Sequence, residues 1–464
     1  MAKSKFVIPV KCGARLDLTV EDIASSGDGI SRYNGYTLFI PNAIGGDRVF
    51  AEVIKTTPRF GVTRLIKLIT PSPDRIAPEC RVYSECGGCQ LQHIKYDKQM
   101  EFKKKVLKDN LERIGKIVLK EDIEVIPAQR PFFYRNKGIF SFKRTRKGLK
   151  VGFFAKGTHR VIDIGYCPVL LKPINEVKEA IRRIIEKSNI SVYNETHHKG
   201  FLRSLIIRES AKTKEILIGL ITTEGSLDKT IIEEMAGIND DLKGDYKIAG
   251  IVQNINSVKT NIILGSENRL LWGRDYINES LGGIAYRLSL TSFFQINPYQ
   301  TEILFKIVED MLKDLTDTVL DIYSGIGSMA LQLAKHHLTV IGIEENEVAV
   351  MDAGRSAERN NIKNCSFLTG AAEDILKSFE GRTDIKAVIL DPPRKGCSEE
   401  VLNSLLKIKP EKIVYISCNP STLSRDLHKL CYNLYEIKKV KIIDMFPQTV
   451  HTETVVFLKR KQET

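Results

Sequence analysis

The sequence lacks the features that mark several large classes of protein. None of its apolar runs approaches the roughly 18 uninterrupted residues of a membrane span, so we expect neither an integral membrane protein nor a membrane partner. The start, MAKSKFVIPVKCG, has no long apolar core and no small-residue cleavage site of the kind found in secretory signals. With 42% hydrophobic residues a disordered or collagenous chain is excluded. We therefore expect a soluble cytoplasmic protein.

Positive charge and cysteine are plentiful by contrast. The 70 Lys and Arg residues outnumber the 57 Asp and Glu, and the net charge of +13 favours a polyanionic partner such as nucleic acid. Nine cysteines in a reducing compartment are more typical of thiols, metal ligands or nucleophiles than of structural disulfides. No obligate protein partner is implied.

The order of the segments predicts roughly three domains in 464 residues. Short apolar runs separated by turns at residues 10–69 predict a small β-barrel, and the segment TPSPD at 70–74 predicts a linker. From about residue 291 onward, strands alternate with helices, as in a parallel, doubly wound sheet. We expect an α/β protein in three parts, with a barrel at 1–69, a central α+β domain at 70–290 and a Rossmann-like domain at 291–464.

A cysteine cluster follows the predicted linker. Cys80, Cys86 and Cys89 form the pattern C-x5-C-x2-C, and Cys167 is a candidate for a distant fourth thiolate. Four sulfur ligands suit either zinc or an iron–sulfur cluster, and the spacing does not choose between them. Three unrelated thiols near a turn are the simpler alternative, and a redox-active C-x-x-C is a weaker one because no βα unit surrounds it. A charged amphipathic helix is predicted next, at 98–114.

A basic, aromatic stretch lies at residues 131–150. It has seven Lys or Arg residues, five aromatic residues and no acid. Basic side chains follow a phosphate backbone and aromatic rings stack on unpaired bases, so we expect RNA contact here. An amphipathic strand pair with its rings inward and its charges in solvent is the alternative, and both can hold together.

A nucleotide-type site is predicted after the apolar strand at 318–320. Its loop, DIYSGIGS, places Gly325 where backbone approaches a ligand closely, and a helix follows at 329–335. The next strand, at 338–343, ends in Glu344, whose position suits hydrogen bonds to ribose hydroxyls. NAD and S-adenosylmethionine (SAM) both fit. Ala330 occupies the third glycine position of the dinucleotide fingerprint, which weighs against NAD.

Three further segments carry candidate catalytic residues. The strand at 387–390 ends in DPPRKG, whose prolines hold Asp391 rigidly at the edge of the sheet. The strand at 412–416 brings Cys418 to the same edge, and the dipole of a helix beginning near residue 421 would favour its thiolate. A buried, inert thiol is the alternative for Cys418. Glu453 begins an apolar strand and points either into a cleft or into solvent.

A thiolate, a carboxylate base and a SAM-like site together suit one reaction. Carbon 5 of uracil is a poor nucleophile until a thiolate adds to C6, and a base must then remove the C5 proton so that the thiolate can leave.

At this point the chain resembles the SAM-dependent RNA uracil-5-methyltransferases, particularly the bacterial 23S ribosomal RNA branch. FFQINP (293–298), DPPRKG (391–396), SCNPSTLSRDL (417–427) and FPQTVHTETV (446–455) carry the resemblance in the family's order. It implies a class I methyltransferase domain, with Cys418 as nucleophile and Glu453 as base. It also implies that SAM is contacted by Gln295, Tyr323, Glu344 and Asp391.

The same resemblance covers the first half of the chain. Residues 10–69 are similar to the TRAM module, an RNA-binding barrel. The cysteines that match the ligands of a [4Fe-4S] cluster are Cys80, Cys86, Cys89 and Cys167. The implied reaction is methylation of a uridine in 23S ribosomal RNA, with the target base flipped out of any helical stack.

Other functions stay open. Transfer RNA is the second substrate, and the presence of both barrel and cluster favours ribosomal RNA. An iron–sulfur or zinc RNA-binding protein without catalysis is a third hypothesis, against which Cys418, Glu453 and Asp391 argue. An NAD oxidoreductase would be distinguished by the cofactor that stabilises it. A zinc deaminase needs a P-C-x-x-C after Glu453, and that motif is absent.

Overall fold

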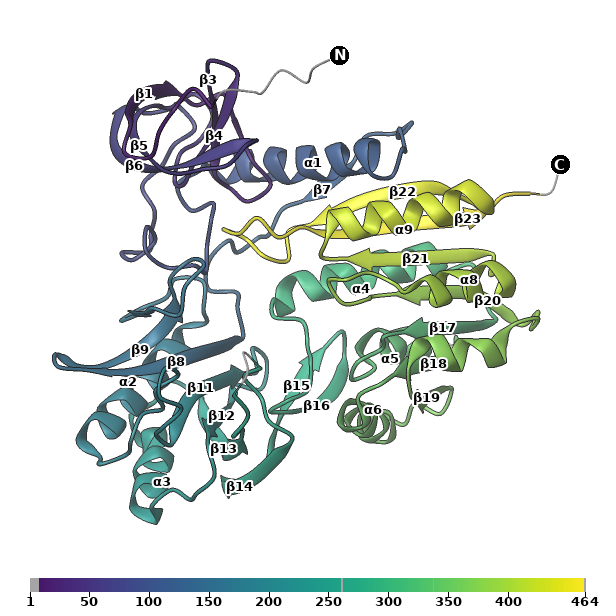
Figure 1. Ribbon diagram of the computed structural model, residues 1–464. Coiled ribbons are helices and arrows are strands. Elements are labelled where there is room, and N and C mark those ends of the chain that lie inside the picture. Colours follow the sequence, from purple (N-terminus) through teal and green to yellow (C-terminus); the bar gives the residue numbers. More distant parts are fainter. Residues whose placement is uncertain (1–7, 260–261, 337, 463–464) are drawn as a thin grey trace. The chain divides into compact units, whose positions relative to one another are not determined.

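The computed structural model describes residues 8–259, 262–336 and 338–462, which form two compact units (Figure 1). The first unit is Met1–Val106 with Gln448–His451, and the second is Leu107–Pro447 with Thr452–Thr464. The first seven residues, where a secretory signal would begin, lie outside the described residues. Within the described ranges, no helix is both long and apolar enough to cross a membrane.

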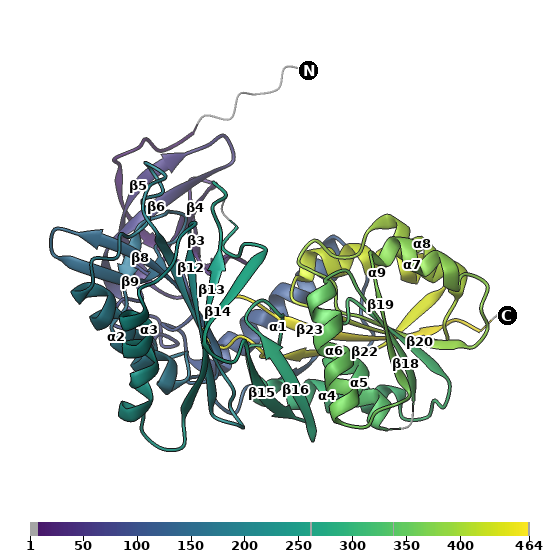
Figure 2. The ribbon, with the colours of Figure 1, turned by 90° about the horizontal axis from the view of Figure 1, so that it is seen from below.

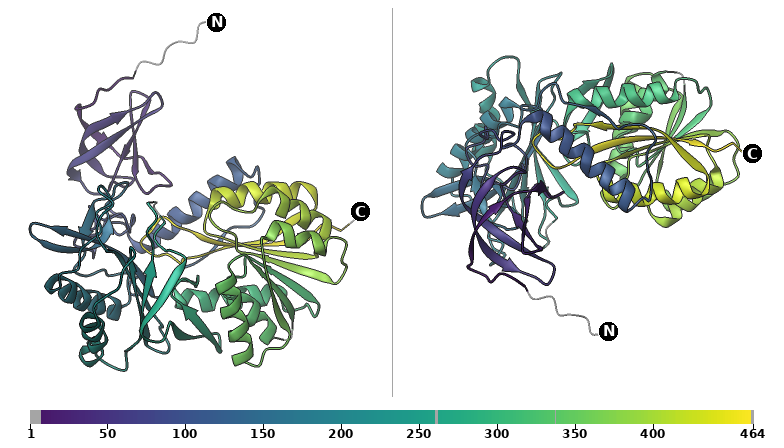
Figure 3. Two further views of the ribbon diagram at one scale, coloured as in Figure 1. Left: turned by 60° about the horizontal axis from the view of Figure 1, so that its bottom comes forward. Right: turned by 90° about the horizontal axis from the view of Figure 1, so that it is seen from above.

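A six-stranded sheet in the first unit curls into a small barrel (Figure 3). Its strands lie in the order β1-β5-β6-β4-β3-β2, with bounds β1 (Arg15–Thr19), β2 (Asp22–Ile23), β3 (Gly29–Tyr33), β4 (Tyr36–Ile40), β5 (Arg48–Thr56) and β6 (Phe60–Thr70). Alternate side chains point inward, as in β4, where Tyr36, Leu38 and Ile40 are buried. Ser31 of β3 donates to the Thr19 carbonyl of β1 at 2.8 Å and joins strands that are far apart in the sheet. The predicted barrel is confirmed.

The segment after the barrel is ordered against it. The buried side chain of Asp47 accepts hydrogen bonds from the backbone N–H groups of Ser72 and Ile44, both at 2.8 Å, and pairs with Arg75 at 2.5 Å. The segment 70–74, which was predicted to form a linker, is therefore a turn that Asp47 of the barrel holds in place.

Helix α1 (Tyr96–Arg113) follows the cysteine segment and confirms the helix predicted at 98–114 to within two residues. Its C-terminal half belongs to the second unit, where Leu107 and Leu111 are buried in the core.

The second unit begins with a seven-stranded, mostly antiparallel sheet. Its order is β10-β9-β8-β11-β12-β13-β14, and its strands are β8 (Lys137–Thr145), β9 (Gly148–Phe154), β10 (Val161–Asp163), β11 (Leu202–Glu209), β12 (Glu215–Thr222), β13 (Lys247–Ile255) and β14 (Glu267–Gly273). Helices α2 (Lys172–Lys187) and α3 (Lys229–Ala236) pack on this sheet, with the 3-10 turn η1 (Gly237–Asp241) after α3. A separate hairpin, β15 (Tyr276–Leu281) and β16 (Ile284–Ser289), leads to the C-terminal part of the chain.

The basic, aromatic stretch at 131–150 forms much of the β8–β9 hairpin. Phe140 and Phe142 are buried, whereas Lys143 and Arg144 are exposed. The amphipathic strand pair expected as the simpler interpretation is therefore present, and its exposed charges stay available to a polyanion.

The C-terminal part contains an eight-stranded sheet in the order β19-β18-β17-β20-β21-β23-β22-β7. The strands are β7 (Glu124–Ile126), β17 (Thr318–Ile322), β18 (Thr339–Glu344), β19 (Cys365–Thr369), β20 (Ile385–Leu390), β21 (Lys412–Ser417), β22 (Tyr435–Ile443) and β23 (Glu453–Arg460). The five strands from β19 to β21 are parallel, and β23 runs antiparallel between β21 and β22. The predicted α/β, Rossmann-like fold is confirmed.

Helices cover both faces of this sheet (Figure 2). The helical elements are α4 (Pro298–Leu312), α5 (Ser328–Lys335), α6 (Glu347–Arg359), α7 (Ala372–Ile375), η2 (Leu376–Phe379), α8 (Glu399–Ile408) and α9 (Pro420–Asn433). One buried cluster joins the sheet to α4, α5 and α6, and another joins it to α1, α8 and α9. Because both faces are covered, the strands are continuously apolar rather than alternating, as in β20, where Val388, Ile389 and Leu390 are all fully buried.

Candidate active site

Strand register places the two predicted catalytic residues at one edge of the sheet. β21 and β23 are antiparallel, with Ser417 opposite Thr454. The next residue outward on each strand is Cys418 and Glu453, so the end of β21 and the start of β23 meet there. Cys418 is half-buried and Glu453 is 2% exposed. The solvated alternative for Glu453 is wrong.

Asp391 and Gln295 lie at the same edge. Asp391 follows β20, which pairs in parallel with β21, and its carboxylate accepts a hydrogen bond from Gln295 Nε2 at 3.4 Å. Gln295 is held by the central sheet, because Asn136 donates from its side chain to the Gln295 carbonyl at 3.2 Å and from its backbone to the Ile296 carbonyl at 3.0 Å. Two segments that are far apart in the sequence are thus fastened together at the site.

Burial dominates the electrostatics of this edge. It raises the pKa of the Asp391 carboxyl to about 7, and burial together with Asp391 raises the pKa of Glu453 well above its usual range. Burial, Glu453 and Asp391 raise the pKa of the Cys418 thiol to about 11, and Arg394 acts in the opposite direction. These groups therefore sense one another's charge. A positively charged ligand beside them would favour the ionised carboxylates and the thiolate.

The predicted nucleotide loop has the tight backbone that close approach to a ligand requires. Tyr323, Gly325 and Gly327 have positive φ values of 68°, 56° and 71°. Gly327 has no room for a side chain, since a Cβ there would lie 2.5 Å from the Phe367 ring. Glu344 is next to the loop as predicted, and its carboxylate accepts the Gly325 N–H at 2.9 Å.

Asp321 is a site residue that the motif contained but that was not singled out. It is buried at the end of β17, and within the described part of the chain its Oδ2 has no hydrogen-bond partner. Burial, followed by the charge of Asp391, raises its pKa to about 8. An acid that closes an apolar strand just before a glycine loop was the available signal. Arg394 was also passed over, although it stands inside DPPRKG.

Of the four predicted metal ligands, Cys80, Cys86 and Cys89 are half-buried and Cys167 is buried. Cys80, Cys86 and Cys89 belong to the first unit and Cys167 to the second. Cys86 Sγ accepts the Gly88 N–H at 3.4 Å, the kind of hydrogen bond that supports a ligating thiolate, so this donor set suits a metal–sulfur group. Among the described residues, however, no three His, Cys, Asp or Glu side chains are grouped so as to hold a metal ion.

A glycine loop, an acid at the end of the next strand and carboxyl groups at the strand ends of a mixed sheet define a nucleotide-cofactor site of the kind that NAD-dependent and SAM-dependent enzymes share. Residues 95–461 match the family described as tRNA (Uracil-5-)-methyltransferase, and residues 9–66 match the TRAM domain. The chain belongs to the tRNA (uracil-5-)-methyltransferase family.

Proteins of similar sequence agree with this membership. An uncharacterized RNA methyltransferase of Clostridium acetobutylicum is 40% identical over 462 residues, which cover 98% of this chain and 99% of that protein. Another, from Halalkalibacterium halodurans, is 38% identical over 464 residues, 99% of this chain and 100% of the relative.

A solved structure supports both the fold and SAM as the methyl donor. The crystal structure of Pyrococcus abyssi tRNA (uracil-54, C5)-methyltransferase in complex with S-adenosyl-L-homocysteine superposes with a TM-score of 0.78 at 30% identity, covering 95% of this chain and 99% of that one. The protein is thus a SAM-dependent RNA uracil-5-methyltransferase, and the predicted enzyme class is confirmed.

Proposed function

We propose that this enzyme methylates C5 of a uridine in 23S ribosomal RNA through a covalent bond between Cys418 and C6 of the base. The observation that carries the proposal is the register of β21 and β23, which brings Cys418 and Glu453 to one edge of the sheet. Asp391 follows β20 and the Tyr323 loop follows β17 at this same edge. A nucleophile and a base are thereby side by side, as addition followed by elimination requires.

Each step assigns one task to one side chain. The Cys418 thiolate adds to C6, and the electron pair of the C5–C6 bond makes C5 nucleophilic. SAM supplies the electrophilic methyl group. Once C5 carries the methyl group, the Glu453 carboxylate takes the C5 proton, the C5–C6 double bond forms again and the Cys418–C6 bond breaks. The products are 5-methyluridine, S-adenosylhomocysteine and a proton held on Glu453.

The raised pKa values describe what must change on binding. Cys418, at about 11, is a neutral thiol at pH 7, and Asp391, at about 7, is only partly ionised. The sulfonium of SAM is a cation, so its arrival beside Asp391 and Cys418 favours the charged forms that addition needs. The SAM contacts that we propose are Gln295, Tyr323, Gly325, Glu344 and Asp391.

RNA contact is proposed for the barrel and for the exposed basic side chains of the β8–β9 hairpin. The three proposed parts are accordingly an RNA-binding barrel at 1–69, a central part at 70–290 and the catalytic part at 291–464. To reach C6, the target uridine must leave its stack, and basic and aromatic groups offset that cost of a few kcal/mol.

Transfer RNA is the second candidate substrate, and one observation favours it. The structural relative from Pyrococcus abyssi is a tRNA (uracil-54, C5)-methyltransferase, and it aligns with 95% of this chain, barrel included. The presence of a barrel therefore does not by itself select ribosomal RNA.

A [4Fe-4S] cluster is proposed on Cys80, Cys86, Cys89 and Cys167. Support comes from the sulfur chemistry of this four-cysteine set and from the N–H···S contact at Cys86. Its role would be structural, because methyl transfer from SAM moves no net electrons. Iron and sulfide analysis of anaerobically purified protein tests the ligands, with Cys167→Ser expected to lower the content of both and Cys365→Ser, a half-buried cysteine elsewhere, expected to leave it unchanged.

The experiment that tests the reaction compares undermodified ribosomal and transfer RNA side by side. Each RNA is incubated with SAM and the anaerobically purified protein, digested, and analysed for 5-methyluridine by mass spectrometry. We expect 5-methyluridine in ribosomal RNA with the wild type and none with Cys418→Ala. Cys431→Ala is the matched control, because burial likewise raises the pKa of this half-buried thiol to about 11.

Product confined to transfer RNA would overturn the proposed substrate and keep the chemistry. Full activity of Cys418→Ala would overturn the covalent mechanism. Absence of product from both RNAs, with SAM bound, would favour the binding-protein hypothesis instead.

A further inference from the structure

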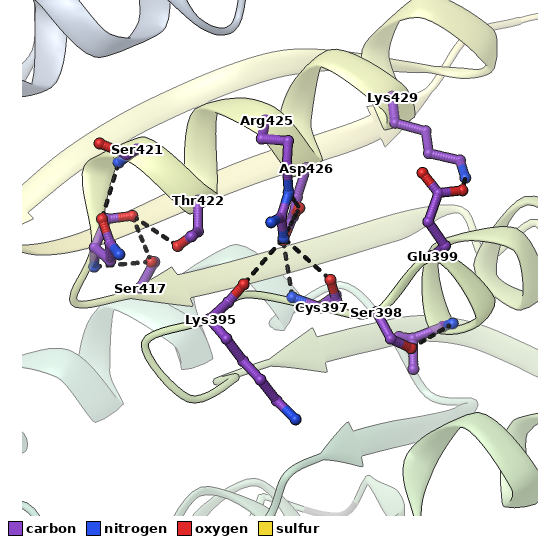
Figure 4. Close-up of polar contacts among 12 residues, drawn as sticks. Lys395, Cys397, Ser398, Glu399, Ser417, Ser421, Thr422, Arg425, Asp426 and Lys429 are labelled. Atoms are coloured by element: carbon purple, nitrogen blue, oxygen red, sulfur yellow. Dashed lines mark hydrogen bonds and ion pairs between the residues drawn. The ribbon is translucent and has the colours of Figure 1, made fainter.

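A fully buried carboxylate, Asp426, lies on α9, eight residues beyond the proposed nucleophile (Figure 4). Asp426 accepts three hydrogen bonds. Its Oδ2 receives the Cys397 N–H at 2.9 Å and the Tyr415 hydroxyl at 2.6 Å, and its Oδ1 receives Arg425 Nε at 2.8 Å. None of these three partners takes part in the steps proposed above, so the mechanism does not use Asp426.

The first thing that Asp426 holds is the turn after DPPRKG. Arg425, oriented by Asp426, donates from Nη2 to the carbonyls of Lys395 and Cys397, both at 3.1 Å. Gly396 lies between them with a φ of 76°, and a Cβ there would lie 2.7 Å from both Asp426 Oδ2 and Arg425 Nη2. The turn and the two α9 side chains are therefore fitted closely to each other.

The start of α9 holds the residue just before this turn. Asn419 donates from Nδ2 to the Arg394 carbonyl at 2.9 Å, and Thr422 donates to it at 3.3 Å. Asn419 directly follows Cys418 and caps α9 by accepting the Ser421 N–H at 3.1 Å. The second half of the loop that begins at Asp391 is thus joined to the helix that begins after Cys418.

The third set of contacts reaches the proposed SAM loop. Tyr415, which donates to Asp426, lies 3.5 Å from Cys397 Sγ through its hydroxyl oxygen. Tyr323 packs against the buried cluster that contains Cys397, and the two side chains influence each other's pKa. A continuous path therefore runs from Asp426 through Tyr415 and Cys397 to Tyr323.

We propose that Asp426 is a positioning residue for methyl transfer, which fixes the Asp391 loop and Tyr323 relative to Cys418. This inference rests on the roles proposed above for those three residues. Asp426 touches no reacting atom. Its contacts converge on three segments that come from β17, β20 and β21, and a displacement of about 1 Å between reacting groups is enough to cost on the order of 10²-fold in rate.

Asp426→Asn is the main variant. An amide matches the shape of the carboxylate, but it cannot accept from Arg425, Cys397 and Tyr415 at once, because one of its two ends is a donor. The control is Glu399→Gln, which breaks the Glu399–Lys429 pair (2.6 Å) between α8 and α9 without touching the path to Tyr323.

Four readouts separate positioning from stability. We expect Asp426→Asn to bind RNA as the wild type does, to lower the single-turnover rate of methylation by about 10- to 100-fold, and to weaken SAM binding. Alkylation of Cys418, followed by peptide mass mapping from pH 7 to 10, should show a shifted pH profile. Glu399→Gln should match the wild type in all four.

Outcomes that overturn the inference are a wild-type single-turnover rate in folded Asp426→Asn, or a loss that only follows the fraction of folded protein. If Asp426→Asn does not fold, Cys397→Ala and Cys397→Ser decide. Ser keeps a hydrogen-bonding group towards Tyr323 and Tyr415, so it should retain more activity than Ala, and equal rates would overturn the inference. Absence of methylation by the wild type would instead overturn the proposed function.

Discussion

Asp47 in the barrel and Glu453 at the catalytic edge are both carboxylic acids shielded from solvent, yet their surroundings differ. Burial alone would raise the pKa of Asp47, but hydrogen bonds from Arg75, Ser72 and Ile44 outweigh it, and the pKa is lowered. Glu453 has burial and the charge of Asp391 acting on it in the same direction, so its pKa is raised. The barrel holds its acid as an anion for structure. The catalytic edge holds its acid in an environment that disfavours the charge.

That contrast separates stability from chemistry. A buried carboxylate that accepts several hydrogen bonds fixes a turn, and its removal is costly. A buried carboxylate that lacks hydrogen-bond donors lowers the stability of the protein, and proteins keep such a group where the reaction uses its proton.

The largest effect is expected for Glu453→Gln. The amide cannot take the C5 proton, so elimination stops and the Cys418–C6 adduct persists. Turnover should fall by about 10²- to 10⁴-fold, and a protein–RNA species should resist denaturing electrophoresis. Folding should be unharmed, because a neutral group replaces a buried acid. Glu436→Gln, an exposed acid on the neighbouring strand β22, serves as the control, and turnover of Glu453→Gln at the wild-type rate would contradict the role of base.

A smaller effect, on stability alone, is expected for Asp47→Asn. Breaking a buried ion pair costs about 3–5 kcal/mol, so hydrogen exchange in the barrel strands should accelerate. Because the folded pKa of Asp47 lies below its unfolded value near 3.8, its contribution is present above that pH and is lost as the pH falls through the folded pKa. The difference between variant and wild type should therefore shrink in acid.

Asp17→Asn is the matched comparison for that experiment. Asp17 pairs with Arg48 at 2.8 Å on the exposed surface of the same barrel, where solvent screens the pair and its contribution to stability is small. Equal hydrogen-exchange rates in the two variants would show that the buried carboxylate contributes no more to the stability of the barrel than the exposed one.

The smallest effect is expected for Glu209→Gln. Burial, then Glu279 and Glu176, raise the pKa of Glu209 to about 8, and within the described residues its Oε2 has no partner. Its folded pKa exceeds the unfolded value near 4.5, so its contribution is fully present below that pH and is lost as the pH rises through about 8. The wild type should therefore lose stability over that interval, whereas a variant with a neutral amide should not lose this contribution.

Thermal unfolding at pH 5 and pH 9 measures this difference. The midpoint of Glu209→Gln should fall less between the two pH values than that of the wild type. Glu234→Gln, an exposed acid on α3, should behave as the wild type does. An identical pH dependence in all three proteins would show that Glu209 does not remain protonated in the folded state.

Much of the catalytic edge was predictable because its residues sit at strand ends. Parallel strands bring their carboxyl ends to one side of a sheet, so the positions of Tyr323, Asp391 and Cys418 follow once the apolar runs before them are recognised. Glu453 required more. It stands at the start of a strand, and only an antiparallel placement of β23 brings it to that side, which a repeating βα pattern does not predict.

Residues whose role depends on contacts between distant segments were not predictable. Asp426 stands on the same helical stripe as Leu423, Leu427 and Leu430, so its spacing is that of the buried face, but the sequence does not show that its partners are in the turn around Gly396. Asn136 precedes a basic strand, and nothing in the local pattern indicates its bonds to the segment around Gln295. Local spacing carries no information about such tertiary contacts.

Strand β7 has a practical consequence for anyone who divides this chain. It pairs with β22, with Val125 opposite Ile442, and covers the outer edge of the catalytic sheet with residues that come from before the central sheet. A fragment beginning at residue 291 would leave the outer edge of β22 at Lys441–Ile443 unpaired and the α1 side of the core without Leu107 and Leu111. Such an open strand invites association with other chains. A separately produced catalytic part therefore has to include the short stretch from Leu107 to Ile126, although the order of the sequence places that stretch before the central sheet.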